Sequence, residues 1–140
     1  MKTLFASQDS FGLFILRISV GIMFAAHGAQ KLFGAFGGSG ISGFTQNLAA
    51  MGLPNPTVQA YLAAGSEFVC GSLLILGLAT RLAVFPLLTV MFVAVYKIHW
   101  AKGFFMQAGG FEYNFIICAA LLALLGLGAG KFSIDRTISE

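Results

Sequence analysis

The sequence predicts an all-α integral membrane protein, a four-helix up-down bundle that forms a single membrane domain over residues 1–140. Two observations predict this fold. Hydrophobic residues make up 58% of the chain and charged residues only 9%, whereas a soluble domain has about 25% charged residues. The chain also contains four apolar runs, each close to the roughly 20 residues that cross a bilayer.

The predicted spans cover about residues 11–33, 58–78, 82–99 and 111–127. The last two are short, which allows a tilted or partly buried helix there. Only "ATR" joins the second span to the third, so we expect these two helices to form a tight antiparallel hairpin. The first span is interpreted as a retained helix and not as a signal peptide, because Arg17 interrupts its apolar run.

A short amphipathic helix is predicted between the first two spans. Ile41, Phe44, Leu48 and Met51 recur at helical spacing, and glycines and the Pro-Asn-Pro at 54–56 mark turns around them. A helix of this kind lies in the membrane interface.

Four spans place both termini on the same side of the membrane as the 79–81 turn. The positive-inside rule weakly favours cytoplasmic termini. The terminal side has four cations and the loop side three: Lys2, Arg81, Lys131 and Arg136 against Lys31, Lys97 and Lys102. The net charge of +3 is scattered without a basic run, which excludes nucleic acid as a partner.

Polar residues gather in the half of the predicted bundle that faces the longer loops. Glu67 is the deepest, about nine residues or roughly 14 Å into the second span. It is flanked by small residues, and a stripe of small residues also joins Arg17 to Lys31 on the first span. We therefore expect an interior polar pocket centred on Glu67, in contact with Arg17, His27 or Lys31. Its other members are Tyr96, Lys97, His99, Glu112, Tyr113 and Asn114.

Several of these residues have simpler explanations, which the sequence leaves open. The lysines at 31, 97 and 102 are near enough to an interface to snorkel to water. Tyr96, His99 and Trp100 resemble an interfacial belt, and Glu112 suits the N-terminal dipole of its helix. Glu67 is too deep to snorkel, and an ionisable residue inside a membrane indicates a functional site by default. A structural ion pair with Arg17 or a lysine is the alternative.

The two cysteines, Cys70 and Cys118, are expected to be free. They form no CxxC pair and fit no structural zinc spacing. Their depths in the predicted spans differ by roughly 7–8 Å, whereas a disulfide needs Cα atoms within about 7 Å. No metal, haem or copper ligand set is recognisable.

The sequence resembles the DoxX family of small bacterial membrane proteins over nearly its whole length. The matching segments are "LRISVGIMFAAHGAQKLFG", "GSEFVCGSLLILGLATRLA", the region of His99, "GGFEYNFIICAALLALL" and "GLGAGKFSID". The resemblance implies four helices in the bacterial inner membrane and a relation to a subunit of thiosulfate:quinone oxidoreductase. It places Lys31, Glu67, Arg81, His99, Glu112 and Asn114 at the family's polar positions and Ser133–Asp135 at a cap after the last helix. Arg17, Arg81 and Asp135 are expected in structural ion pairs.

The preferred functional hypothesis is a subunit or accessory of a membrane oxidoreductase system that binds quinone or a small sulfur species. Donors from His27, Lys31, His99 and Tyr113 would bind the ligand, and Glu67 would relay protons. Candidate catalytic residues are Glu67, His27 and His99; candidate ligand-binding residues are Lys31, Glu67, Tyr96, His99, Glu112, Tyr113 and Asn114. The expected partners are the lipid bilayer and other membrane or redox subunits. The alternatives are a non-enzymatic binding or transport protein for a small solute and a structural assembly partner.

Overall fold

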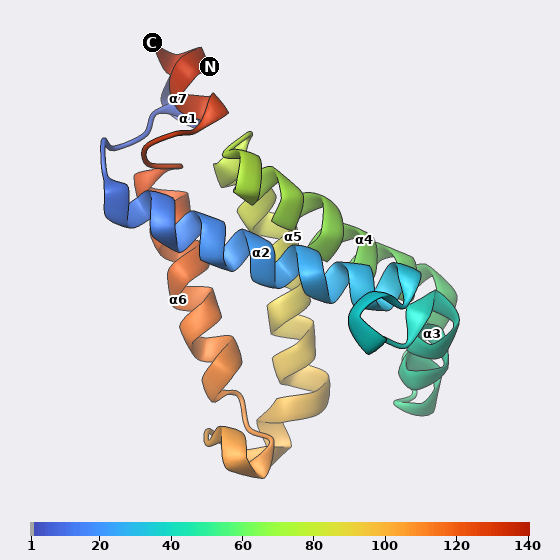
Figure 1. Ribbon diagram of the computed structural model, residues 1–140. Coiled ribbons are helices and arrows are strands. Elements are labelled where there is room, and N and C mark those ends of the chain that lie inside the picture. The colour runs from blue at the N-terminus through green and yellow to red at the C-terminus, as the bar shows by residue number, and fades with distance from the viewer. Residues whose placement is uncertain (1) are drawn as a thin grey trace.

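The computed structural model describes residues 2–140, and every regular element in that part of the chain is a helix (Figure 1). The all-α prediction is therefore confirmed. The α-helices are α1 (Lys2–Phe5), α2 (Phe11–Phe33), α3 (Gly40–Ala50), α4 (Pro56–Leu76), α5 (Thr80–Ala94), α6 (Glu112–Leu127) and α7 (Ile134–Ser139). Short 3-10 or π-helical turns occupy Ala35–Gly37, Val95–His99, Trp100–Lys102 and Met106–Ala108.

Three helices are long and apolar enough to cross a membrane: α2, α4 and the continuous helical stretch Thr80–Lys102. The third is longer than the predicted 82–99, because α5 continues through a π-helical turn at Val95–His99. The helix α6 has 16 residues, a length of about 24 Å, against a hydrocarbon core of about 30 Å. The all-helical membrane fold is thus shown, whereas four complete spans are not.

The helices α2 and α4 lie side by side along most of their length (Figure 1). Glycines allow their backbones to come close. A Cβ atom on Gly28 would collide with the backbone nitrogen of Phe68, and one on Gly71 would lie 2.5 Å from the backbone nitrogen of Ala25. The predicted stripe of small residues therefore forms the contact between these helices.

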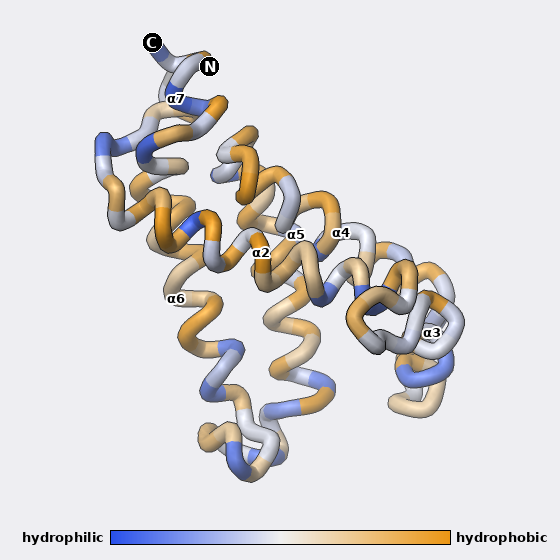
Figure 2. The backbone as a smooth tube through the Cα atoms, viewed as in Figure 1, coloured by the Kyte–Doolittle hydropathy of each residue, from blue (hydrophilic) through white to orange (hydrophobic). Residues whose placement is uncertain are grey.

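A second pair, α5 and α6, diverges from α2 and α4 on the way from the chain termini toward the loops (Figure 1). A shared core of buried side chains joins the two pairs: Val20, Phe24, Leu74, Val84, Leu87, Leu121 and Leu124. Hydrophobic residues recur along these helices (Figure 2), and several of them, Ile22, Val69, Phe92 and Ile116, have exposed side chains. Exposed apolar side chains on spanning helices are the surface that a bilayer covers.

The amphipathic helix predicted between the first two spans is α3. Leu48 is buried against Leu53 and Ala60, and Ile41 and Phe44 pack on the same cluster. The apolar face of α3 therefore packs against the first turns of α4.

Arg17 is buried near the other end of the bundle, where its guanidinium donates five hydrogen bonds to carbonyl oxygens. The acceptors are the backbone oxygens of Leu74, Ile75, Ala129, Lys131 and Phe132, at 2.7–3.2 Å. Two of them are the last carbonyls of α4, which have no partner within their own helix. Arg17 thus ties the end of α4 to the segment after α6.

Asp135 and Arg81 also bind backbone groups. The carboxylate of Asp135 accepts hydrogen bonds from the backbone N–H groups of Ala79 and Thr80, at 2.6 and 2.8 Å, and so caps the start of α5. Arg81 donates to the carbonyl oxygens of Thr3 and Gly126. The ion pairs expected for Arg17, Arg81 and Asp135 are absent within residues 2–140. The physical reason is that helix ends leave backbone groups without partners, and these groups make charge-assisted hydrogen bonds with the three side chains instead.

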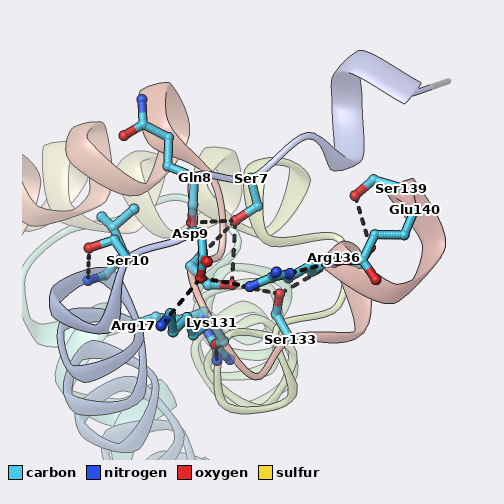
Figure 3. Close-up of polar contacts among 12 residues, drawn as sticks. Ser7, Gln8, Asp9, Ser10, Arg17, Lys131, Ser133, Arg136, Ser139 and Glu140 are labelled. Atoms are coloured by element: carbon cyan, nitrogen blue, oxygen red, sulfur yellow. Dashed lines mark hydrogen bonds and ion pairs between the residues drawn. The ribbon is translucent and has the colours of Figure 1, made fainter.

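Ion pairs join the two ends of the chain, which lie together (Figure 1). Asp9 contacts Arg136 at 2.7 Å and Lys131 at 3.6 Å (Figure 3). Hydrogen bonds from Arg136 to Glu140 and Asp9 raise the pKa of the guanidinium, so Arg136 stays charged. These contacts hold α7 against the segment that precedes α2.

Candidate functional site: a polar cavity between the helix pairs

A cavity of about 630 Å³ lies where the two helix pairs diverge. Residues of α2, α3, α4, α5, the π-helical turn and α6 line it. Its volume is in the range that holds a small-molecule ligand or cofactor. Most of its wall is apolar, and the predicted polar residues that reach it are His27, Lys31, Glu67, Lys97, His99, Tyr113 and Asn114.

Lys31 and Glu67 form an ion pair in the wall of this cavity. The Lys31 Nζ atom lies 2.7 Å from Oε1 of Glu67. The Glu67 side chain is 2% exposed and that of Lys31 is 28% exposed. The predicted contact between Glu67 and a cation of the first span is therefore present. The second carboxylate oxygen, Oε2, is buried and accepts no hydrogen bond from the described residues.

Two neighbouring polar side chains of α6 face methionine sulfur atoms. Tyr113 donates its hydroxyl hydrogen to Sδ of Met23, at 2.7 Å, and the Asn114 amide nitrogen lies 3.5 Å from Sδ of Met91. Asn114 is 3% exposed, and no group in the described part of the chain donates to its Oδ1 oxygen. A buried oxygen without a donor costs free energy, so both this atom and Oε2 of Glu67 need an explanation.

The two histidines occupy different positions around the cavity. His99 lies in the π-helical turn, and its Nδ1 atom is 2.7 Å from the carbonyl oxygen of Gly109. Because a carbonyl only accepts, Nδ1 carries the hydrogen, and Nε2 of the neutral ring is an acceptor. His27 also lines the cavity, and its side chain is exposed.

Two predicted ligand-binding residues lie outside the cavity. Tyr96 is 77% exposed and does not line it. Glu112 is exposed and accepts a hydrogen bond from the backbone N–H of Met106, at 3.0 Å. Tyr96 and Glu112 therefore do not line the cavity, and their role in ligand binding stays a prediction.

The sequence prediction missed other residues of the wall. Gln59, Ala63 and Ser66 line the cavity with Glu67. They are spaced by four and then three residues, which places them on one face of the helix. This spacing could have predicted them from the sequence. Met23 and Met91 also line it, and nothing in their sequence context distinguishes them from ordinary core residues.

Some apolar residues of the cavity wall are exposed on the outside of the helices. Leu62 of α4 and Val93 of α5 both line the cavity, and their side chains are 65% and 44% exposed. Both residues lie in helices that are long enough to cross a membrane.

The chain is similar to one protein family and to several bacterial proteins. The DoxX family model matches residues 12–100. "Inner membrane protein YphA" of Escherichia coli is 32% identical, with 89% of this chain and 88% of YphA covered. "Putative oxidoreductase CatD" of Bacillus subtilis is 32% identical, with 82% and 79% covered.

A shorter match links the chain to an uncharacterized protein of Haemophilus influenzae, which is 36% identical over 57% of this chain. The chain spans about half of that relative, 53% of its length. No solved structure matches. The family match covers more than half of the chain and agrees with the helical membrane architecture: the protein is a member of the DoxX family.

Proposed function

We propose that the protein is an inner-membrane component of an oxidoreductase system and that its cavity binds a quinone-class molecule. The observation that carries this proposal is the combination, in one cavity, of a mostly apolar wall, the ion pair between Lys31 and the buried Glu67, and the exposed apolar lining residues Leu62 and Val93. A lipid-soluble ring with polar substituents fits that combination, because it would enter from the bilayer and bring polar atoms to the ion pair.

The membrane arrangement that we propose has four spans, with α6 as the fourth and the termini in the cytoplasm. Trp100, Phe104, Phe111 and Phe115 pack ring against ring at the loop end of α6, with centroids 5.4–6.0 Å apart. Aromatic residues favour the membrane interface, so this cluster would extend the short apolar length of α6. The inner-membrane name of YphA supports the location.

The residues of the cavity suit a ligand that exchanges protons. A bound quinone would supply two-electron, two-proton chemistry. Glu67 lines the cavity and has one carboxylate oxygen without a donor in the described chain, and its partner Lys31 is partly exposed on the loop side. The pair therefore offers a proton a route between the cavity and that surface. The oxidoreductase name of CatD supports a redox role, and partner subunits would supply or receive the electrons.

A second candidate is a binding or transport protein for a small solute. His27 and Lys97 are exposed and also line the cavity, which favours access from water as well as from lipid. A small sulfur species would use this polar route.

Binding in lipid nanodiscs tests the proposal. Decylubiquinone is titrated into the purified protein, and heat is measured against empty nanodiscs. We expect saturable binding that Ala63→Trp weakens, because Ala63 lines the cavity. Leu122→Trp is the matched control, because Leu122 is an exposed residue of α6 away from the cavity. Binding that does not saturate, or that both variants retain equally, contradicts the proposal.

A further inference from the structure

Two residues that line the cavity each have a buried side-chain oxygen atom without a donor in the described chain. The two atoms are Oε2 of Glu67 on α4 and Oδ1 of Asn114 on α6. Both side chains are at least 97% buried, at 2% and 3% exposed. Buried acceptors are nearly always satisfied in folded proteins, so two of them in one cavity point to a ligand that donates hydrogen bonds.

Three donors of the cavity wall are already used. Lys31 donates to the other oxygen of Glu67, and Tyr113 donates to Met23. The amide nitrogen of Asn114 faces the sulfur of Met91. A thioether sulfur only accepts, so the Asn114 amide keeps this orientation and its oxygen stays without a donor. Among the cavity-lining residues, the two buried side-chain atoms without a partner in the described chain are therefore both acceptors.

The charge of the cavity selects against a cationic donor. Glu67 contributes −1, and Lys31 and Lys97 contribute +1 each, so the charged lining residues sum to +1. An amine cation would add to that positive charge in a region of low dielectric constant. A neutral hydroxyl group avoids this cost and still donates.

We propose that the cavity prefers the reduced form of its ligand, an uncharged aromatic diol of the hydroquinone type, over the oxidised quinone. The two hydroxyl groups of the diol would donate to Oε2 of Glu67 and Oδ1 of Asn114. The carbonyl oxygens of a quinone only accept, so the same two positions would place acceptor against acceptor. This inference rests on the proposed quinone-class ligand and specifies which redox form the site recognises.

Competition binding with three ring analogues tests the preference. Decylubiquinol, decylubiquinone and the dimethyl ether of decylubiquinol are compared anaerobically in nanodiscs that contain the full-length protein. The ether keeps the apolar ring and tail but has no hydroxyl donors. We expect the diol to bind at least about tenfold more tightly than either of the others.

Two variants separate the two acceptors. Asn114→Leu removes an acceptor at nearly constant size and is expected to reduce the preference for the diol. Glu67→Gln replaces the acceptor by a side chain that also donates, so the preference is expected to shift toward the quinone. Glu112→Gln is the matched control, because the exposed carboxylate of Glu112 lies outside the cavity. Melting temperatures establish that each variant is folded, and Asn114→Leu decides the question if Glu67→Gln does not fold.

The outcomes distinguish the inference from the proposed function. If no analogue binds saturably, the proposed function is wrong. If the quinone or the ether binds as tightly as the diol, the function stands and the preference for the diol is overturned. An unchanged preference in folded Asn114→Leu and Glu67→Gln proteins also overturns it, because the two acceptors would then play no part.

Discussion

The ammonium group of Lys31 joins α2 to α4 by contacting only one of the two carboxylate oxygens of Glu67, at 2.7 Å. The pair is asymmetric, since Lys31 reaches the surface and Glu67 does not. It explains in part why the first span tolerates charged residues. Arg17 is satisfied by carbonyl oxygens, whereas Lys31 is satisfied by a buried carboxylate.

This asymmetry predicts unequal costs for the two single substitutions. Lys31→Met leaves the buried Glu67 without its partner and is expected to lower the free energy of unfolding by about 3–5 kcal/mol. Glu67→Gln is expected to cost less, because the partly exposed Lys31 can be hydrated. Denaturation in detergent, followed by circular dichroism, measures both. Equal costs would contradict the assignment of Glu67 as the buried partner.

The close contact between α2 and α4 predicts opposite effects for two glycine substitutions. Gly28→Ala places a methyl group against the backbone of Phe68 and is expected to destabilise the protein by about 1–3 kcal/mol. Gly65→Ala, in α4, meets no atom within 4 Å and is expected to be neutral or stabilising by up to about 1 kcal/mol. Melting temperatures of the two proteins are compared. A destabilised Gly65→Ala and a normal Gly28→Ala would show that the helices pack differently.

Arg17 is predicted to be irreplaceable by lysine. Its three nitrogen atoms reach carbonyl oxygens of both α4 and residues 129–132, whereas a lysine has a single nitrogen. Arg17→Lys leaves buried carbonyl groups without a donor, and each such group costs about 1–3 kcal/mol. We therefore expect the free energy of unfolding to fall by about 3 kcal/mol or more in the same denaturation assay. Arg136→Lys is the control. Arg136 lies in exposed ion pairs, and we expect no measurable change there.

The features that were predicted from the sequence depend on local spacing. Apolar length and turn residues gave the helices α2, α3 and α4 to within a few residues, and small residues at helical spacing gave the contact between α2 and α4. The depth of Glu67 and the position of Lys31 gave the pair at the centre of the cavity. Each of these inferences uses residues of one helix or of two adjacent helices.

The features that were missed depend on contacts with no local signal. The partners of Arg17 include carbonyl groups 112 to 115 residues away, and backbone oxygens leave no mark in a sequence. Tyr96 lies in the π-helical turn before Trp100 and is exposed, which its predicted depth alone does not reveal. Glu112 was predicted to line the cavity because of its depth in the last span. Its carboxylate instead accepts a hydrogen bond from Met106, in the connection that precedes α6.

The proposed four-span arrangement predicts a pattern of cysteine labelling. In a protein with Cys70 and Cys118 replaced by alanine, single cysteines are introduced by Ser39→Cys, Gln107→Cys and Ser139→Cys. A membrane-impermeant maleimide is then added to intact spheroplasts and, as a control, to lysed ones. The positions at 39 and 107 lie in the two connections at the loop end, and position 139 lies in α7 beside the N-terminal segment (Figure 1).

We expect labelling at 39 and 107 in intact spheroplasts and labelling at 139 only after lysis. The comparison of 107 with 139 tests α6 directly, because these positions flank that helix. If α6 crosses the membrane, the two positions differ; if it does not, they label alike. Labelling at 139 alone in intact spheroplasts would reverse the orientation while keeping four spans. Because the cavity lies toward the loop end, that result would also move the partly exposed Lys31 to the cytoplasmic side.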